Sequence, residues 1–224
     1  ILTILAVIGT TITPWGIFYL QASIADKGVE MEQYSNTRID VSFGATWGNI
    51  ISGFIIIVTA ATLFQAGILV EDAKDAALAL EPLAGNWAGL LFAAGLLGAS
   101  LLAVSVLPLS TTYAICEAFG FERGLNRSTK EAPVFYGTFA LIIFVSLLIV
   151  LIPGIPLFPI MILSQAMNAI LLPVVLILIL KLANDTSIMG RFGNSKLTNF
   201  LAYGITALIM VVTAVLLFEP LIRI

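Results

Sequence analysis

The chain has 224 residues, of which 60% are hydrophobic and only 10% are charged, and its formal net charge is −3. This composition, with a mean hydropathy of +1.09, excludes a soluble domain and predicts an all-α polytopic membrane protein. One cysteine and no histidine exclude an internal disulfide, a thiolate metal cluster and a serine–histidine hydrolase, and neither an enzyme nor a nucleic-acid partner is expected.

The first predicted span covers residues 1–25 and is broken near 9–15. Its middle reads Gly9-Thr10-Thr11-Ile12-Thr13-Pro14-Trp15, where a membrane helix favours leucine. Pro14 cannot donate to the helical ladder and clashes with the preceding turn, and Gly9 adds flexibility. In hydrocarbon each freed carbonyl needs a partner inside protein or in a water-lined cavity. We therefore expect a broken helix at a transporter's substrate site, with a proline kink in a packing helix as the alternative.

Five further spans are predicted, at 41–65, 87–119, 134–152, 157–182 and 197–218. Each can cross a hydrocarbon core of about 30 Å, which needs roughly 20 helical residues. Eight of the ten basic residues lie in or beside the loops 26–40, 120–133 and 183–196. The positive-inside rule therefore predicts that these three loops are cytoplasmic.

Amide side chains within the later spans are candidates for polar contacts in the membrane. Asn49 follows Trp47 and Gly48, where it either faces a water-filled pathway or packs between helices. Gln165 offers a neutral amide oxygen that can accept from, or ligate, a substrate. Interhelical hydrogen bonding is the alternative role of Gln165 and of Asn168.

Three segments resemble the NRAMP divalent-metal transporter family: VIGTTITPWGIFYLQASIADKG (7–28), EPLAGNWAGLLFAAGLLGAS (81–100) and LSQAMNAILLPVVLILIL (163–180). They are similar to the family's sixth, eighth and tenth helices, and the resemblance covers nearly the whole chain. It implies a LeuT-type fold of two inverted repeats, located in the cell inner (plasma) membrane. The chain would be a partial one, holding the second inverted repeat plus one helix. We expect it to be the later part of a longer transporter, because it begins inside a hydrophobic span.

The sixth-helix segment departs from the family pattern at two positions. The family motif ends in Met-Pro-His, and the corresponding residues here are Thr13-Pro14-Trp15. A thioether favours transition metals, whereas a hydroxyl oxygen suits Mg²⁺, which prefers oxygen ligands and retains waters. Trp15 cannot carry a proton, and Val134–Ile152 contains none of the arginines found in the family's ninth helix. The chain thus resembles the NRAMP-related magnesium transporter branch, which implies transport of Mg²⁺ and/or Mn²⁺ without proton coupling.

The candidate metal ligands are Thr10 and Thr11 through their backbone carbonyls, Thr13 through its hydroxyl, and Gln165. Pro14, Trp15 and Asn49 are candidates for the pathway or a gate. No cofactor is expected beyond the transported ion. The resemblance implies that the first repeat of the transporter is a partner of this chain. Its Asp-Pro-Gly-Asn metal motif would supply the negative charge that balances the ion.

Other functions stay open at this point. Within transport, the runner-up is a proton-coupled Mn²⁺/Fe²⁺ importer, which the absence of histidine disfavours. An amino-acid transporter of the same fold would bind a carboxylate at a half-helix N-terminus, but the tenth-helix resemblance argues against it. From another class, a non-transporting membrane scaffold or signalling module would be favoured by a long soluble appendage.

Overall fold

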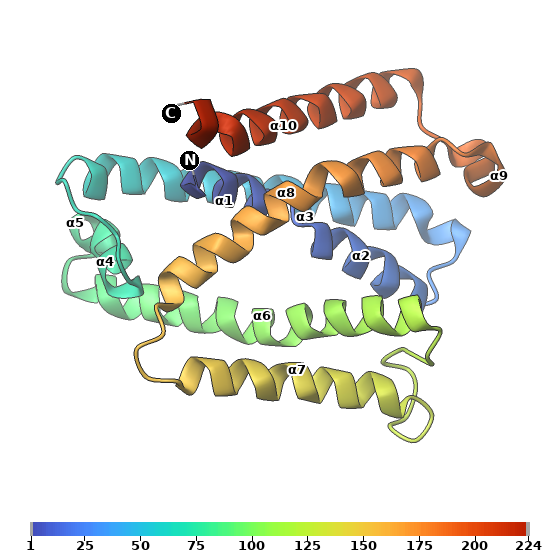
Figure 1. Ribbon diagram of the computed structural model, residues 1–224, viewed down its shortest axis with the longest axis horizontal. Coiled ribbons are helices and arrows are strands. Elements are labelled where there is room, and N and C mark those ends of the chain that lie inside the picture. Colours follow the sequence, from blue (N-terminus) through green and yellow to red (C-terminus); the bar gives the residue numbers. More distant parts are fainter. Residues whose placement is uncertain (1, 223–224) are drawn as a thin grey trace. The chain divides into compact units, whose positions relative to one another are not determined.

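The structure is a computed structural model that describes the backbone of residues 2–222 and the side chains of these residues except 83, 216 and 218–222. Residue 1, at which the first span was expected to begin, lies outside the described residues. All regular elements in the described part are helical (Figure 1). The prediction of an all-α membrane protein is therefore confirmed.

The long helices are α1 (Leu2–Thr11), α2 (Pro14–Asp26), α3 (Tyr34–Thr59), α6 (Ala88–Phe119), α7 (Pro133–Leu151), α8 (Leu157–Ala183) and α10 (Lys196–Ile222). Short helical segments join them: η1 (Met31–Gln33), η2 (Ala60–Phe64), α4 (Ala73–Ala77), η3 (Leu78–Leu80), α5 (Glu81–Ala84), η4 (Gly85–Trp87), α9 (Thr186–Met189) and η5 (Gly190–Phe192). In the described part of the chain, six helical stretches are long and apolar enough to cross a membrane: Leu2–Asp26, Met31–Phe64, Gly85–Phe119, Pro133–Leu151, Leu157–Ala183 and Lys196–Val215.

The second span begins as a helix earlier than its hydropathy indicates. The helix α3 starts at Tyr34 and follows directly on η1, so much of the segment 26–40 is helical rather than an open loop. Hydropathy marks only the apolar part of a helix, and Val29–Phe43 contains neither Gly nor Pro to stop it. Thr37 also satisfies a backbone carbonyl there, because its hydroxyl donates to the Gln33 carbonyl at 3.0 Å.

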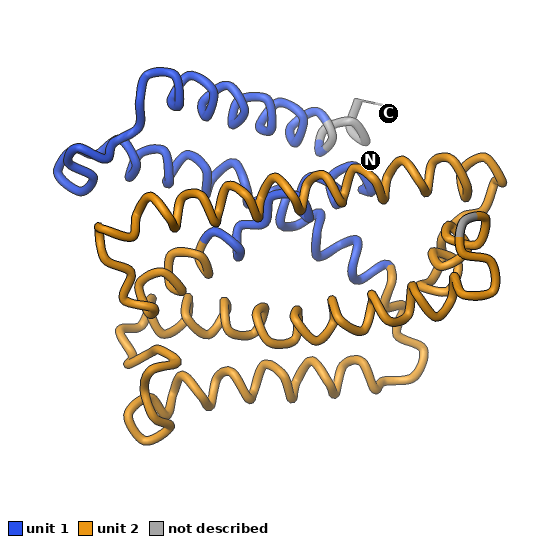
Figure 2. Tube along the Cα trace, turned by 180° about the vertical axis from the view of Figure 1, so that it is seen from behind, with its two compact units in different colours: residues 1–17, 159–224 blue, residues 18–158 orange. Residues whose placement is uncertain are grey.

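The chain divides into two compact units, residues 1–17 with 159–224 and residues 18–158 (Figure 2). The first unit holds α1, most of α8 and α10. Its core is small and tight: Leu5 packs with Ala166 and Ala169, and Ile8 lies against them. Asn184 and Asn199 exchange hydrogen bonds through their amides and so connect the end of α8 to the start of α10.

The second unit is built on α6 and α7, which are consecutive and lie side by side (Figure 1). Its core comprises Ala22, Leu109, Tyr113, Cys116, Ala132 and Phe135. The rings of Tyr113 and Phe135 meet edge to face, with centroids 5.0 Å apart, a favourable geometry for aromatic pairs. Because Ala22 belongs to this core, the later turns of α2 are packed onto the α6–α7 pair.

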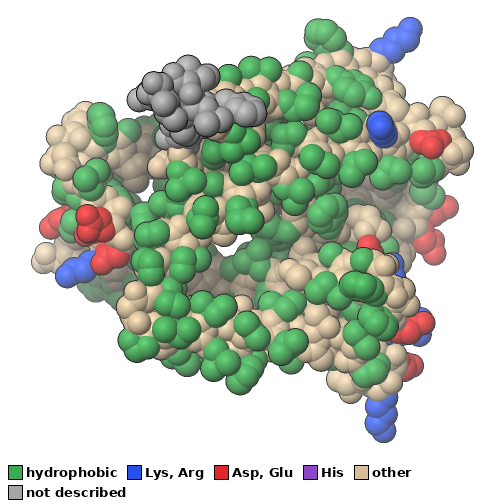
Figure 3. Space-filling view, in the orientation of Figure 1, with side chains coloured by type: hydrophobic (Ala, Val, Ile, Leu, Met, Phe, Trp, Pro, Cys, Tyr) green, Lys and Arg blue, Asp and Glu red, His purple; other side chains and the backbone are tan. Residues whose placement is uncertain are grey.

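On the face drawn in Figure 3, charged side chains lie toward the left and right edges and hydrophobic ones are spread between them. Many large apolar side chains are exposed along α3, α6 and α7. Exposed apolar side chains of this kind are stable in a lipid bilayer, because the lipid tails are as apolar as the side chains and already keep them away from water.

Candidate functional site

The broken helix predicted from the sequence is present as two helices with a gap of two residues. The helix α1 ends at Thr11, Ile12 and Thr13 lie outside regular structure, and α2 begins at Pro14. The ladder continues to Ile12, whose N–H donates to the Ile8 carbonyl at 3.2 Å. It cannot continue to Pro14, which has no N–H to offer the Thr10 carbonyl. Proline is instead well suited to the first position of the next helix.

The threonine side chains at the break present oxygen atoms without charge. The Thr11 hydroxyl donates to the Val7 carbonyl at 2.7 Å, which leaves its lone pairs as acceptors. Thr10 is exposed and Thr13 is half-buried. A Cβ on Gly16 would lie 2.7 Å from the Thr13 hydroxyl oxygen, so the absence of a side chain at Gly16 leaves room for that hydroxyl. The side chains in and beside the break therefore offer neutral, hard oxygen acceptors.

The helix α8 crosses α1 at Gly9, immediately before the break. A Cβ on Gly9 would overlap the Gln165 carbonyl oxygen and lie 2.8 Å from the Ala169 backbone nitrogen. Only glycine permits this backbone-to-backbone approach, which is common where small residues meet in membrane helix pairs. The sequence predicts flexibility at Gly9, whereas in the structure Gly9 is the point where two helices cross closely. The only signal in the sequence is the small size of Gly9, Ala166 and Ala169.

The crossing brings the α8 turn that carries Gln165 against the α1 turn that precedes Thr10. The Gln165 side chain is half-buried, and its Oε1 accepts a hydrogen bond from Asn168 Nδ2 at 3.1 Å. An amide oxygen has a second lone pair, so this bond orients Gln165 without exhausting its capacity to accept. Asn168 lies in the same helix as Gln165, so this bond is within α8 rather than the interhelical bond that the sequence offered as the alternative role of both residues.

The candidate pathway residues lie in different surroundings. Pro14 is fully buried and Trp15, which follows it in α2, is half-buried. Asn49 lies on α3, in the other compact unit, and is exposed. Its Nδ2 donates to the Ala45 carbonyl of its own helix at 2.8 Å. The amide oxygen of Asn49 is still able to accept a hydrogen bond.

The candidate ligands at the break and on α8 are all uncharged residues. Among the described residues, no group of three or more His, Cys, Asp or Glu side chains is placed to hold a metal ion. Asp26, the acid at the far end of α2, is already hydrogen-bonded to Tyr113 and to the loop after α6. A divalent ion at the break would meet oxygen dipoles from this chain, and its charge would have to be balanced by other carboxylates.

Comparison with known proteins decides the family. Residues 1–219 match the family described as Natural resistance-associated macrophage protein-like, or Nramp. The chain belongs to the Nramp family. The six helical stretches of the described residues that are long and apolar enough to cross a membrane agree with the family's LeuT-type fold.

Curated relatives of this Nramp chain are bacterial proteins named divalent metal cation transporter MntH. That of Clostridium acetobutylicum is 26% identical over 229 residues, which cover 97% of this chain and 49% of the relative. That of Yersinia enterocolitica is 28% identical over 224 residues, covering 94% and 50%. A shorter match, 36% identical over 100 residues, is to the protein of Erwinia tasmaniensis and covers 42% and 24%. The first and second of these relatives match nearly the whole chain, and the chain spans about half of their own length.

Proposed function

We propose that this chain forms the broken-helix half of a membrane transporter for divalent metal cations, which works by alternating access around Ile12 and Thr13. The observation that carries the proposal is the interruption between α1 and α2, lined by uncharged oxygen acceptors. Membership of the Nramp family, together with relatives named divalent metal cation transporters, supports the same substrate class. The transported ion is a substrate and not a resident cofactor.

The residue types at the break favour Mg²⁺ and/or Mn²⁺ as the ion. Thr13 supplies a hydroxyl oxygen, and Gln165 an amide oxygen, in place of a soft sulfur ligand. Oxygen ligands suit Mg²⁺, which keeps several of its waters when bound to protein. Since Trp15 cannot accept a proton and the chain has no histidine, we infer that transport is not coupled to protons. These features correspond to the magnesium-transporting branch of the family.

The remaining parts of the proposal concern the whole transporter. We assign residues 1–224 to the second inverted repeat and one further helix, with spans 1–25, 41–65, 87–119, 134–152, 157–182 and 197–218. The first repeat would be the partner that supplies carboxylates to the ion. The segments 26–40, 120–133 and 183–196 would face the cytoplasm of a cell whose inner (plasma) membrane holds the protein, because most of the basic residues lie in or beside them.

Ion uptake into liposomes tests the proposal on the full-length protein that carries this chain. We expect Mg²⁺ and Mn²⁺ to enter without acidification of the lumen, recorded with an internal pH dye. Entry of Mn²⁺ alone, with acidification, would instead establish a proton-coupled Mn²⁺/Fe²⁺ importer. No uptake of either ion would contradict transport of divalent cations and favour a scaffold or signalling role.

Gln165→Leu tests whether the amide oxygen contacts the ion. We expect the KM for Mn²⁺ to rise about tenfold, the effect of losing roughly 1.4 kcal/mol of binding. Asn168→Leu removes only the donor that orients Gln165 and is expected to raise the KM by a smaller factor. Initial uptake rates over a range of ion concentrations measure both. An equal or greater effect of Asn168→Leu would show that the pair acts in helix packing rather than in ion binding.

A further inference from the structure

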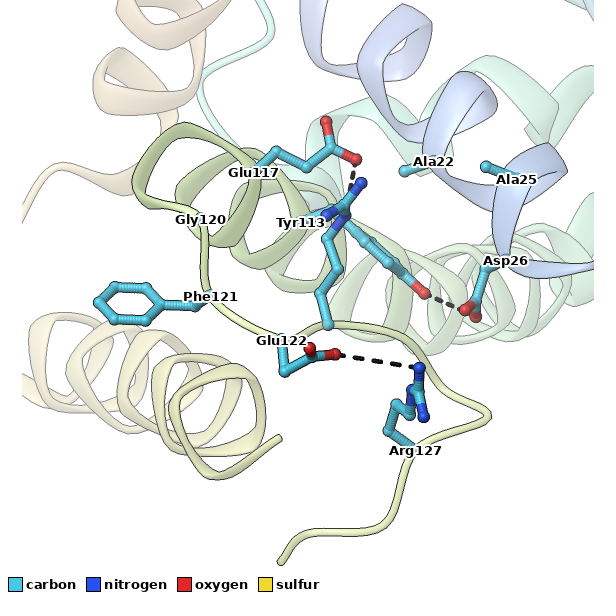
Figure 4. Close-up of a pocket in the computed structure, with 10 residues that line it drawn as sticks. Ala22, Ala25, Asp26, Tyr113, Glu117, Gly120, Phe121, Glu122 and Arg127 are labelled. Atoms are coloured by element: carbon cyan, nitrogen blue, oxygen red, sulfur yellow. Dashed lines mark hydrogen bonds and ion pairs between the residues drawn. The ribbon is translucent and has the colours of Figure 1, made fainter. Parts of the chain in front are cut away.

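The far end of α2 is held by a set of hydrogen bonds that the ion site does not use. Asp26 is the last residue of α2, and its Oδ2 accepts from the Tyr113 hydroxyl at 2.9 Å and from the Leu125 backbone N–H at 2.9 Å. The Asn126 side chain donates to the Asp26 backbone carbonyl at 2.7 Å. Figure 4 shows the Tyr113 ring, from α6, pointing at the Asp26 carboxylate. One residue thus joins α2 both to α6 and to the loop that follows α6.

The loop is shaped to receive this carboxylate. Gly124 has a φ of +124°, and a Cβ there would overlap Asp26 Oδ1, so any other residue would be strained and would displace the acid. The loop itself is tied to α7, because the Tyr136 hydroxyl donates to the Arg127 carbonyl at 2.8 Å. Hydrogen bonds that involve a charged partner are shorter and stronger than neutral ones. Asp26 therefore fixes both the position and the orientation of the end of α2.

Apolar packing supports the same attachment one turn earlier. Ala22 is buried, and Tyr19 packs against the cluster formed with Leu109 and Phe135. Beside the Asp26 contacts lies an open cavity of about 360 Å³. Its lining includes the ion pair between Glu117 and Arg123, whose Oε1 and Nε are 2.9 Å apart. Loss of the Asp26 side chain would extend a polar, open cavity rather than create an apolar void, so we expect such variants to fold.

We propose that Asp26 is a positioning residue that makes α2, α6 and the α6–α7 loop one rigid body. The broken helix then bends only at Ile12 and Thr13, because its other end cannot swing away from α6. The consequence for transport rests on the proposed function, since it assumes that movement at the break accompanies passage of the ion. The rigid body itself concerns residues 18–26 of α2, α6 and the α6–α7 loop, which all lie in one compact unit, and it is measurable without transport.

The test is a distance measurement by pulsed electron resonance in the full-length protein. Spin labels are placed at Lys27→Cys, just after α2, and at Leu151→Cys, the exposed last residue of α7, with the buried Cys116 replaced by alanine. The α7 helix of 19 residues separates the labels by a span of roughly 28 Å, which suits the method. We expect one narrow distance that is the same with and without Mg²⁺. A change on adding Mg²⁺ would overturn the proposal.

Matched variants identify the group responsible. Asp26→Ala and Tyr113→Phe are expected to broaden or shift the distance by roughly 2 Å or more, the size of common helix displacements. Asp26→Asn keeps an acceptor oxygen and should retain the narrow distance. Tyr136→Phe removes the α7 hydroxyl that donates to the Arg127 carbonyl of the same loop and leaves the Asp26 hydrogen bonds in place, so it should also retain the narrow distance. A distance that stays narrow in both Asp26→Ala and Tyr113→Phe would overturn the role of Asp26.

Uptake of Mn²⁺ by the same variants separates this inference from the proposed function. Asp26→Ala should lower the maximal rate about tenfold or more, because a small misplacement far from the site can be costly, while leaving the KM nearly unchanged. Asp26→Asn should restore the rate. If the unmodified protein transports nothing, the proposed function fails, and the rigid body is still judged by the distances. A raised KM with an unchanged rate would contradict the positioning role.

Discussion

Replacing Gly9 with alanine is expected to destabilise the protein by about 2–3 kcal/mol, within the usual cost of overpacking a tight interior. The added Cβ would overlap the Gln165 carbonyl oxygen and approach the Ala169 nitrogen, and both are backbone atoms that cannot rotate away. The two helices would have to separate. We expect the thermal unfolding midpoint of the full-length protein in detergent to fall by roughly 2–4 °C.

Gly98→Ala is the matched control for this prediction. Gly98 also lies inside a long apolar helix, α6, but a Cβ there would meet nothing within 4 Å. Alanine has the higher helix propensity, so this change should leave the midpoint unchanged or raise it slightly. Equal midpoints for Gly9→Ala and Gly98→Ala would show that α1 and α8 do not cross at Gly9. Gly9→Ala should also slow uptake, because the crossing sets Gln165 relative to Thr10.

Thr13→Met is expected to shift ion preference toward Mn²⁺ and away from Mg²⁺ on the order of tenfold, equivalent to about 1.4 kcal/mol. A thioether is a soft ligand that transition metals accept and Mg²⁺ does not, whereas the threonine hydroxyl offers a hard oxygen. Thr13 lies in the two-residue gap between α1 and α2, where its side chain is half-buried. The measurement is competitive uptake of the two ions into liposomes.

Thr13→Val distinguishes a ligand effect from a change of shape. Valine matches the size of threonine but has no lone pair, so uptake of both ions should weaken without a large change in their ratio. If Thr13→Met leaves the ratio of Mn²⁺ to Mg²⁺ uptake unchanged, Thr13 has no part in selectivity. If valine and methionine change the ratio equally, the space at this position, and not the thioether, sets the preference.

Much of the architecture follows from the properties of neighbouring residues, which can be read directly from the sequence. Long apolar stretches favour helices, because backbone N–H and C=O groups in hydrocarbon can form hydrogen bonds only with one another. Pro14 interrupts its helix in any context, since it lacks the N–H that the Thr10 carbonyl would need. The residue types at the break, Thr13 and Trp15 among them, are likewise properties of the chain itself. The helical class and the break of α1–α2 were therefore predictable.

The ends of the helices and the hydrogen-bond partners of side chains were harder to predict from the sequence. The helix α3 begins at Tyr34, where polar residues remain helical although their hydropathy does not mark a span. Asn49 bonds to its own helix, and Gln165 pairs with Asn168, choices that depend on rotamers and neighbours rather than on residue type. Amide side chains donate and accept equally well, so the sequence leaves their partners undetermined.

By itself the sequence determined that this is a helical membrane protein with an interrupted first helix and neutral oxygen groups at the interruption. Only the tertiary structure decided that Gly9 is the point where α8 crosses α1, and that Asp26 anchors the end of α2. The physical reason is that propensity and hydropathy act over one or two turns of a single helix. A crossing of two backbones, or a bond between residues 26 and 113, depends on how distant helices pack together.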